Sequence, residues 1–193
     1  MSSDYNQDTI HSYNSNIQKY FDAEQPLAEG VHKQWIDYTC ELLPAQATVF
    51  EIGTATGRDA RYLESKGLLV TKTDASDGFI KRDPTIKKFN LLQDKINNKY
   101  DLIFANAVLL HLKEADIANA LKVIKEGLKP NGYFSFSLKK GSGSLVSSHK
   151  LDAPRFFTLW SEEFITLKLD KSGLQVERIF EDTKWLMLVA KLK

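Results

Sequence analysis

The stretch from Val49 to Asp59 constrains the fold of this chain most strongly, because it combines a short apolar run with a tight glycine turn and the start of a helix. The apolar run is typical of a buried central strand. Gly53 and Gly57 lack the side chains that would keep a ligand away from the backbone. A loop that opens onto a helix N-terminus presents free N–H groups, which suit a carboxylate, a phosphate or a ribose. The stretch therefore predicts a cofactor site at the end of this strand.

The spacing of the glycines distinguishes two kinds of nucleotide site. The dinucleotide pattern G-x-G-x-x-G would place its third glycine at Arg58, so it fits poorly. The pattern that starts at Gly53 is instead G-x-A-x-G, and the acid Glu51 precedes it. This arrangement resembles motif I of the class I S-adenosylmethionine-dependent methyltransferases, acid-x-G-x-G-x-G, with Ala55 in place of the middle glycine.

Composition limits the class of protein. The chain has 193 residues, which suits one domain, and its formal net charge of +1 does not favour non-specific binding to nucleic acid. Cys40 is the single cysteine, so no internal disulfide can form, and no signal segment opens the sequence. No apolar run approaches the roughly 20 residues of a membrane helix. We therefore expect a cytoplasmic protein that does not insert into membranes and is a monomer or a weak dimer.

The hydrophobic pattern predicts alternating helices and strands along the chain. The expected helices cover 32–43, a stretch from Asp59 to about 67, 115–128 and 161–173. The expected strands cover 49–52, 68–73, 86–92, 100–107, 133–138, 175–180 and 185–191, with a turn at 130–132 and a Gly/Ser/Lys loop at 139–150. With the resemblance, this order implies an α/β fold with a doubly wound, mostly parallel seven-stranded sheet that ends in an antiparallel hairpin.

The polar residues up to about Glu29 carry aromatic and aliphatic side chains three to five positions apart, which approximates a helical stripe. One interpretation is a surface helix packed on the domain. The other, which the resemblance implies, is a lid across the cofactor, with Tyr13 and Tyr20 seven positions apart on one face. We predict a helical lid at 1–45 packed on a cofactor-binding core at 46–193, within one domain.

Asp74 stands at the end of the second predicted strand. Its distance from Glu51 in the sequence matches one strand-helix-strand unit, which brings both strand ends to the same edge of a parallel sheet. An acid at that edge can accept hydrogen bonds from both ribose hydroxyls of a nucleoside. The alternative is a solvated loop aspartate, and the glycine turn upstream favours the ribose role.

Three further segments resemble one branch of the same methyltransferase family. They are Ala105–Leu112 (ANAVLLHL), Ser137–Gly143 (SLKKGSG) and Arg155–Phe157 (RFF), and the Gly57–Asp59 triplet is similar to tellurite-resistance methyltransferases. The resemblance covers nearly the whole chain. It implies S-adenosyl-L-methionine as cofactor, S-adenosyl-L-homocysteine as product, and a set of cofactor-binding residues. That set is Tyr20, Glu51, Gly53, Thr54, Ala55, Gly57, Arg58, Asp74, Ala75, Ser76, Asn90, Leu91, Asn106, Ala107, Val108 and His111.

Methyl transfer from a sulfonium is an in-line displacement, so the protein mainly aligns the reactants and excludes water. No metal is expected, because the cysteine and the histidines form no ligand pattern. His111 and then Tyr13 are the candidates for a general base, although a lone histidine in an apolar stretch is more often a core or loop residue.

The acceptor is the least constrained part of the prediction. Lys139 and Arg155 flank a Gly/Ser loop after a strand that should end beside the donor methyl, so we expect a small-molecule acceptor bearing a carboxylate or another small anion. A solvated basic loop is the alternative for these two residues. A tRNA methyltransferase and a non-catalytic cofactor-binding protein are the other function classes that the sequence leaves open.

Overall fold

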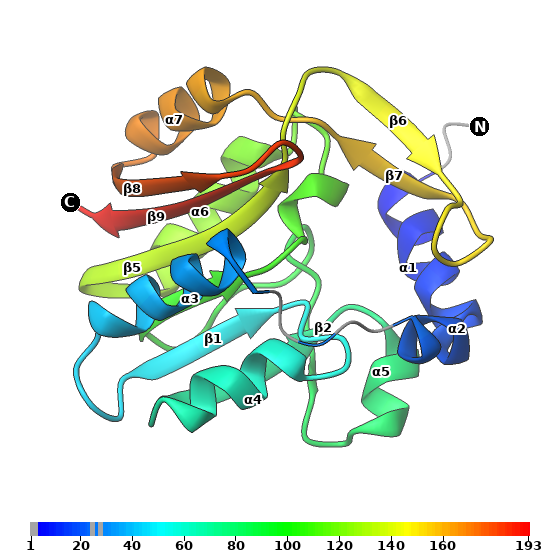
Figure 1. Cartoon of the computed structure of the whole chain (residues 1–193), viewed down its shortest axis with the longest axis horizontal. Coiled ribbons are helices and arrows are strands. Elements are labelled where there is room, and N and C mark those ends of the chain that lie inside the picture. Colours follow the sequence, from blue (N-terminus) through cyan, green and yellow to red (C-terminus); the bar gives the residue numbers. More distant parts are fainter. Residues whose placement is uncertain (1–3, 24–25, 27–28) are drawn as a thin grey trace.

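A seven-stranded sheet forms the centre of the molecule (Figure 1). The computed structural model describes residues 4–23, 26 and 29–193. The sheet has the order β3-β2-β1-β4-β5-β9-β8, in which the first five strands are parallel and β9 is antiparallel to both of its neighbours. The strands are β1 (Thr48–Ile52), β2 (Leu69–Asp74), β3 (Lys87–Lys88), β4 (Tyr100–Ala105), β5 (Leu128–Lys139), β8 (Leu174–Glu181) and β9 (Trp185–Leu192). The predicted mostly parallel sheet with a C-terminal antiparallel hairpin is therefore confirmed.

Helices cover both faces of this sheet. They are α1 (Tyr5–Ser15), α2 (Ile17–Asp22), α3 (Val31–Glu41), α4 (Arg58–Ser65), α5 (Asp77–Arg82), α6 (Ile117–Gly127) and α7 (Glu162–Lys171), and a 3-10 turn, η1 (Leu109–His111), follows β4. The apolar side chains of α3 and α4 pack on one face, and those of α6 and α7 pack on the other. None of the helices in the described ranges is long and apolar enough to cross a membrane.

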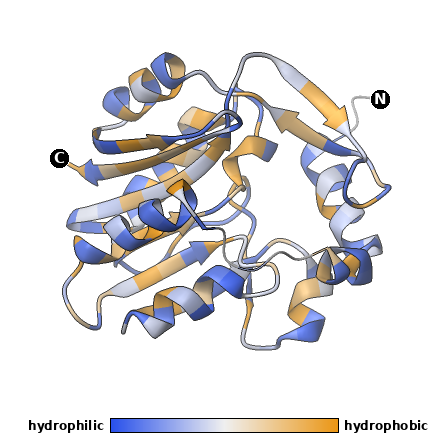
Figure 2. Cartoon of the chain, viewed as in Figure 1, coloured by the Kyte–Doolittle hydropathy of each residue, from blue (hydrophilic) through white to orange (hydrophobic). Residues whose placement is uncertain are grey.

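The central strand β4 shows why the sheet lies between two helical layers. Leu102 and Phe104 point to the face covered by α3 and α4, while Ile103 and Ala105 point to the face covered by α6 and α7. All four are fully buried, as a strand apolar on both faces should be. Trp35 of α3 stacks on Phe104, with 5.1 Å between ring centroids. Figure 2 shows the same distribution, with hydrophobic residues concentrated along the inner strands.

Two expectations about strands were wrong. The strand predicted at 86–92 is reduced to β3, because Asn90 and Asp94 use their side chains to accept hydrogen bonds from nearby backbone N–H groups. The expected loop at 139–150 contains β6 (Ser144–Ser147), which pairs with β7 (Arg155–Thr158) in a separate two-stranded sheet. The Gly/Ser-rich residues beside β6 are typical of a loop, and β6 is stabilised by its pairing with β7.

Smaller corrections concern element ends. The helix expected to begin at Asp59 begins one residue earlier, and the turn expected at 130–132 lies within β5. The N-terminal stripe forms two helices, because the side-chain amide of Asn16 donates to the backbone oxygen of Ser12 where α1 ends. Positions 1–3, 24, 25, 27 and 28 of that stripe lie outside the described residues.

Candidate functional site

A cavity of about 560 Å³ lies at the carboxyl ends of the parallel strands. It is situated between β1 and β4, where the strand order reverses direction and where α/β proteins of this kind commonly bind ligands. Helices α1 and α2 and the β6–β7 hairpin stand opposite the sheet edge (Figure 1). Its wall includes Tyr13, Tyr20, Gly53, Thr54, Ala55, Arg58, Asp74, Ala75, Ser76, Asn90, Leu91, Asn106, Ala107, Val108, His111, Lys139 and Arg155, all of which the sequence had suggested.

The turn between β1 and α4 has a left-handed backbone at three positions. The φ angles of Gly53, Ala55 and Gly57 are +72°, +49° and +77°. A Cβ atom on Gly53 would lie 2.5 Å from Cγ2 of Val108. Gly53 is therefore required by the packing of the turn on Val108 as well as by the space a ligand would need.

Two of the predicted cofactor residues lie behind the turn and not on the cavity wall. Gly57 is the left-handed residue that precedes α4. Glu51 is 2% exposed, and its Oε2 atom has no hydrogen-bond partner among the described residues. Burial raises the pKa of Glu51 to about 8, and the charges of Asp59 and Asp74 act in the same direction. Both residues thus shape the turn from its buried side.

Asp74 fixes the turn from the neighbouring strand. Its Oδ2 accepts a hydrogen bond of 2.9 Å from the backbone N–H of Ala55, and its Oδ1 accepts one of 2.8 Å from the N–H of Ser76. Burial raises the pKa of Asp74 to about 6, while these N–H groups oppose that shift. Each carboxylate oxygen has two lone pairs, so Asp74 can still accept hydrogen bonds from a ligand in the cavity.

A hydrogen-bonded chain fixes the exit of β4. Asp59 accepts from the Arg58 guanidinium at 2.7 Å and from the side-chain amide of Asn106 at 2.7 Å. The oxygen of Asn106 accepts from Ser137 Oγ at 2.6 Å, and Ser137 Oγ accepts from the N–H of Ala107 at 2.8 Å. The nitrogen and the oxygen of the Asn106 amide both form hydrogen bonds within the protein, so the cavity wall at the end of β4 is rigid.

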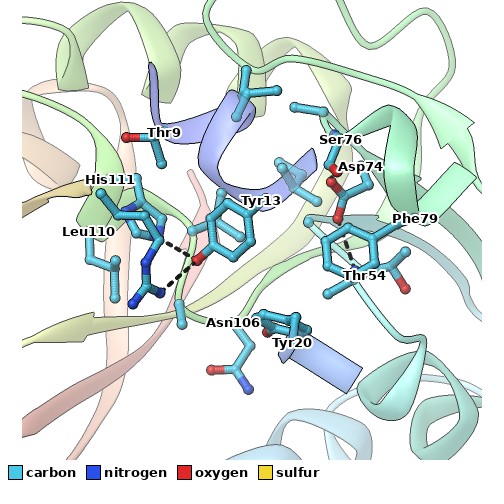
Figure 3. A pocket seen from close by; sticks show the side chains of 18 of the residues that line it. Thr9, Tyr13, Tyr20, Thr54, Asp74, Ser76, Phe79, Asn106, Leu110 and His111 are labelled. Atoms are coloured by element: carbon cyan, nitrogen blue, oxygen red, sulfur yellow. Dashed lines mark hydrogen bonds between the residues drawn. The ribbon is translucent and has the colours of Figure 1, made fainter. Parts of the chain in front are cut away.

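The opposite side of the cavity is organised around the hydroxyl of Tyr13 (Figure 3). Nδ1 of His111 lies 2.6 Å from the carbonyl oxygen of Phe156, and because a carbonyl only accepts, Nδ1 carries the proton. Nε2 of His111 then accepts from the Tyr13 hydroxyl at 3.0 Å, and Arg155 Nη1 donates to the same hydroxyl oxygen at 3.4 Å. Burial and the positive charges of Arg155 and Lys139 together lower the pKa of His111 to about 4.

Arg155 and Lys139 lack carboxylate partners among the described residues. Arg155 is 6% exposed, and its Nε has no acceptor within that part of the chain. Its guanidinium lies 5.5 Å from the ring centroid of Tyr13, and Lys139 Nζ lies 4.4 Å from the ring centroid of Phe157. Burial and the charge of Arg155 lower the pKa of Lys139. A buried cation without a counter-ion is costly, so this side of the cavity is suited to an anion.

Sequence reasoning missed a further part of the cavity wall. The missed residues include Asn6, Thr9, His32, Asp59, Phe79, Ser147, His149, Lys150 and Trp185. Asn6 and Thr9 share the helical spacing of Tyr13, so that spacing could have identified them. Ser147 and Lys150 belong to the hairpin that was not predicted, and Lys150 Nζ lies 3.8 Å from the ring centroid of Tyr20.

Comparison with known proteins supports the fold and the class. A family model described as a methyltransferase domain matches residues 22–179. No curated protein sequence matches the chain. A solved complex of DhpI with SAM and HEP has a TM-score of 0.75 at 15% identity, over 98% of this chain and 99% of that one.

Two further solved structures are similar at low sequence identity. The 1,6-didemethyltoxoflavin-N1-methyltransferase of Burkholderia thailandensis, with 1,6-didemethyltoxoflavin and S-adenosylhomocysteine bound, has a TM-score of 0.71 at 18% identity, over 97% of this chain and 87% of that one. The glycopeptide N-methyltransferase MtfA complexed with S-adenosyl-L-methionine has a TM-score of 0.67 at 15% identity, over 86% and 95%. Likenesses at this level of identity show a shared fold.

We predict that Ala55→Gly stabilises the protein, although glycine usually destabilises. Ala55 has a φ of +49°, where a Cβ atom is strained. The expected gain is about 0.5–1 kcal/mol in the free energy of unfolding by urea. Ala118→Gly, an exposed position inside α6, is the matched control and should lose a similar amount. Destabilisation of both variants alike would contradict the strain at Ala55.

We also predict that Glu51→Gln reduces the loss of stability toward alkaline pH. The pKa of Glu51 is higher in the folded protein than in the unfolded chain, so the folded state favours the protonated carboxyl. This contribution to the free energy of unfolding is complete below about pH 4.5 and is lost as the pH rises to about 8. Urea unfolding should therefore favour the variant over the natural protein by roughly 1 kcal/mol or more at about pH 9. Glu177→Gln, at an exposed position of β8, is the control and should leave the profile unchanged. Parallel profiles for the natural protein and Glu51→Gln would refute the assignment.

Proposed function

Because the chain belongs to the methyltransferase domain family, we propose that it transfers a methyl group from S-adenosylmethionine to a small acceptor that carries a negative charge. The observation that carries this proposal is the division of one cavity into two sides. One side has the glycine turn, Asp74 and the Arg58–Asp59 ion pair, and the other has Arg155 and Lys139, which have no carboxylate partner among the described residues. The first side suits a cationic sulfonium donor and the second an anionic acceptor.

The donor side fits an adenosyl group through its own hydrogen-bonding atoms. Asp74 would accept from the ribose hydroxyls, since its lone pairs are not exhausted by Ala55 and Ser76. Asn90 and Leu91 follow β3 and would contact the adenine. The remaining proposed contacts are Tyr20, Gly53, Thr54, Arg58, Ala75, Asn106, Ala107, Val108 and His111, with Glu51 and Gly57 supporting the turn from behind.

The acceptor side is proposed to bind its ligand through Arg155 and Lys139. The planar guanidinium of Arg155 can hold two oxygens of a carboxylate or a similar anion with parallel hydrogen bonds, and Nε is free for one of them among the described residues. Lys139 would add a point charge from the end of β5. An anion between them would offset the cost of burying Arg155 beside the half-buried Lys139.

Bound S-adenosylmethionine would supply an electrophilic methyl group on a sulfonium. The protein would hold the acceptor nucleophile in line with that methyl group and exclude water. For an acceptor that arrives protonated, the Tyr13 oxygen takes the proton while the proton of Tyr13 moves to Nε2 of His111. The protein itself would form no bond to the methyl group, so Tyr13 and His111 would only take up the proton that the acceptor loses.

Within 1–45, we propose that α1 and α2 are the lid, since α3 packs on the sheet through Trp35. The lid contacts both sides of the cavity. Asn14 Oδ1 accepts from Ser76 Oγ at 2.7 Å, and Thr9 Oγ1 accepts from the backbone N–H of Phe156 at 3.2 Å. Such a cover favours a small-molecule acceptor over RNA.

Asp74→Ala should weaken S-adenosylmethionine binding by about 1.5–3 kcal/mol, because hydrogen bonds to a charged group are lost. Asp74→Asn should lose less, since its amide oxygen can still accept from one backbone N–H. Calorimetry with S-adenosylmethionine, S-adenosylhomocysteine and NAD measures this. Asp77→Ala, which removes a nearby surface acid paired with Lys88, is the control and should bind normally. Binding of NAD without S-adenosylmethionine would overturn the proposed donor.

Arg155→Lys should weaken binding of sulfate and acetate, used as probes, by roughly tenfold, because lysine is a point charge and cannot form the bidentate hydrogen bonds of arginine. Calorimetry in saturating S-adenosylhomocysteine measures this, and affinity for S-adenosylhomocysteine itself should not change. Arg178→Lys on β8, where Arg178 stacks over Tyr38, is the matched control. If Arg155→Lys lowers only the melting temperature, Arg155 simply ties β7 to α1, and the anion site is refuted.

A further inference from the structure

His111 and Tyr13 lie side by side on the cavity wall, and both ring nitrogens of His111 form hydrogen bonds. Nδ1 donates to the carbonyl of Phe156. Nε2 accepts from the Tyr13 hydroxyl, a contact drawn in Figure 3. That same hydroxyl oxygen accepts from Arg155. One hydroxyl thus connects the imidazole, which can take a proton, to the guanidinium, which can take an anion.

The groups around His111 make a positive imidazole unfavourable in the free protein. Tyr13 faces it from α1, Lys139 from the end of β5, and Arg155 from β7, and the uncharged ring of Phe157 lies at 4.7 Å. No carboxylate of the described residues hydrogen-bonds to the ring. Burial and the two cations together keep the pKa of His111 near 4, so the imidazole is neutral around neutral pH.

An anion on Arg155 would change this balance. It would offset the positive charges of Arg155 and Lys139 that oppose a proton on His111, and nearby charges of that kind shift pKa values by one unit or more. We propose that an anion bound at Arg155 and Lys139 raises the proton affinity of His111, so that binding of the acceptor makes His111 a stronger base. This inference rests on the anionic acceptor of the proposed function.

The coupling suits the charge changes of methyl transfer. A sulfonium donor brings a positive charge into the cavity and loses it when the carbon–sulfur bond breaks. A proton that arrives on His111 at that moment keeps the net charge of the closed cavity constant. His111 would thus remain neutral before transfer and be able to accept a proton during it.

Binding linkage makes the coupling measurable without knowing the natural acceptor. If an anion raises the pKa of His111, protonation of His111 must strengthen anion binding by the same factor. Sulfate is a suitable probe because its charge is constant in this pH range. In protein saturated with S-adenosylhomocysteine, a shift of one unit from a pKa of about 4 should raise sulfate affinity by about threefold as the pH falls from about 8 to about 4.5.

The variant His111→Asn separates this linkage from other titrations. Its side-chain amide can still donate to the carbonyl of Phe156 but does not titrate, so the rise in sulfate affinity should largely disappear. His149→Gln, at the other histidine on this side of the cavity, is the matched control and should keep the rise. A rise that persists in His111→Asn would come from another group, such as Asp74, and would overturn the proposal.

Nitrogen NMR of the natural protein provides a test that does not depend on a variant folding. The ring nitrogens of His111 should titrate at a pH about one unit or more higher with sulfate than without it. An unchanged pKa with sulfate bound would overturn the coupling and leave the anion site standing. No binding of sulfate, together with normal S-adenosylhomocysteine binding, would refute both the coupling and the anionic acceptor but not the donor site.

Discussion

The carboxylate of Asp74 connects the parts of the sheet edge on which the site depends. It accepts from the N–H of Ala55 in the turn after β1 and from the N–H of Ser76 before α5. Asn14 of α1 then bonds to Ser76 Oγ and to the N–H of Gly78. The turn, the start of α5 and the docking of the N-terminal helix thus share one buried acid. Because these contacts are linked, small changes at Asp74 would reach both the turn after β1 and the docking of α1.

Charge is sorted across the cavity. Asp59 and Asp74 lie beside the turn, whereas Arg155 and Lys139 lie beside the hairpin, and the hydroxyl of Tyr13 stands between the two groups. Asp59 is paired with Arg58, whereas Arg155 has no carboxylate partner among the described residues. A buried charge without a counter-ion reduces stability, and the proposed anionic acceptor would offset that cost at Arg155.

Much of the fold could be predicted from the sequence, because its signals are local. The apolar run of β4 indicated burial on both faces, and the spacing from Glu51 to Asp74 placed two strand ends together. β3 and β6 could not be predicted in the same way. At β3 the side chains of Asn90 and Asp94 bind backbone that a longer strand would use, and β6 exists through its pairing with β7.

The sequence by itself determined the residue types at the turn, the order of the strands and the positions of most cavity residues, since strand ends in a parallel sheet converge by topology. Only the tertiary structure decided the surroundings of Glu51 and His111. Glu51 lies beside the predicted cofactor turn in the sequence, yet its side chain is buried and is not part of the cavity wall. His111, Tyr13 and Arg155 come from three distant elements, and their shared hydroxyl exists because folding packs α1, η1 and β7 together. Local hydrophobic patterns indicate which residues of a segment are buried. The proton affinity and the charge pairing of a side chain depend instead on neighbours that are distant in the chain.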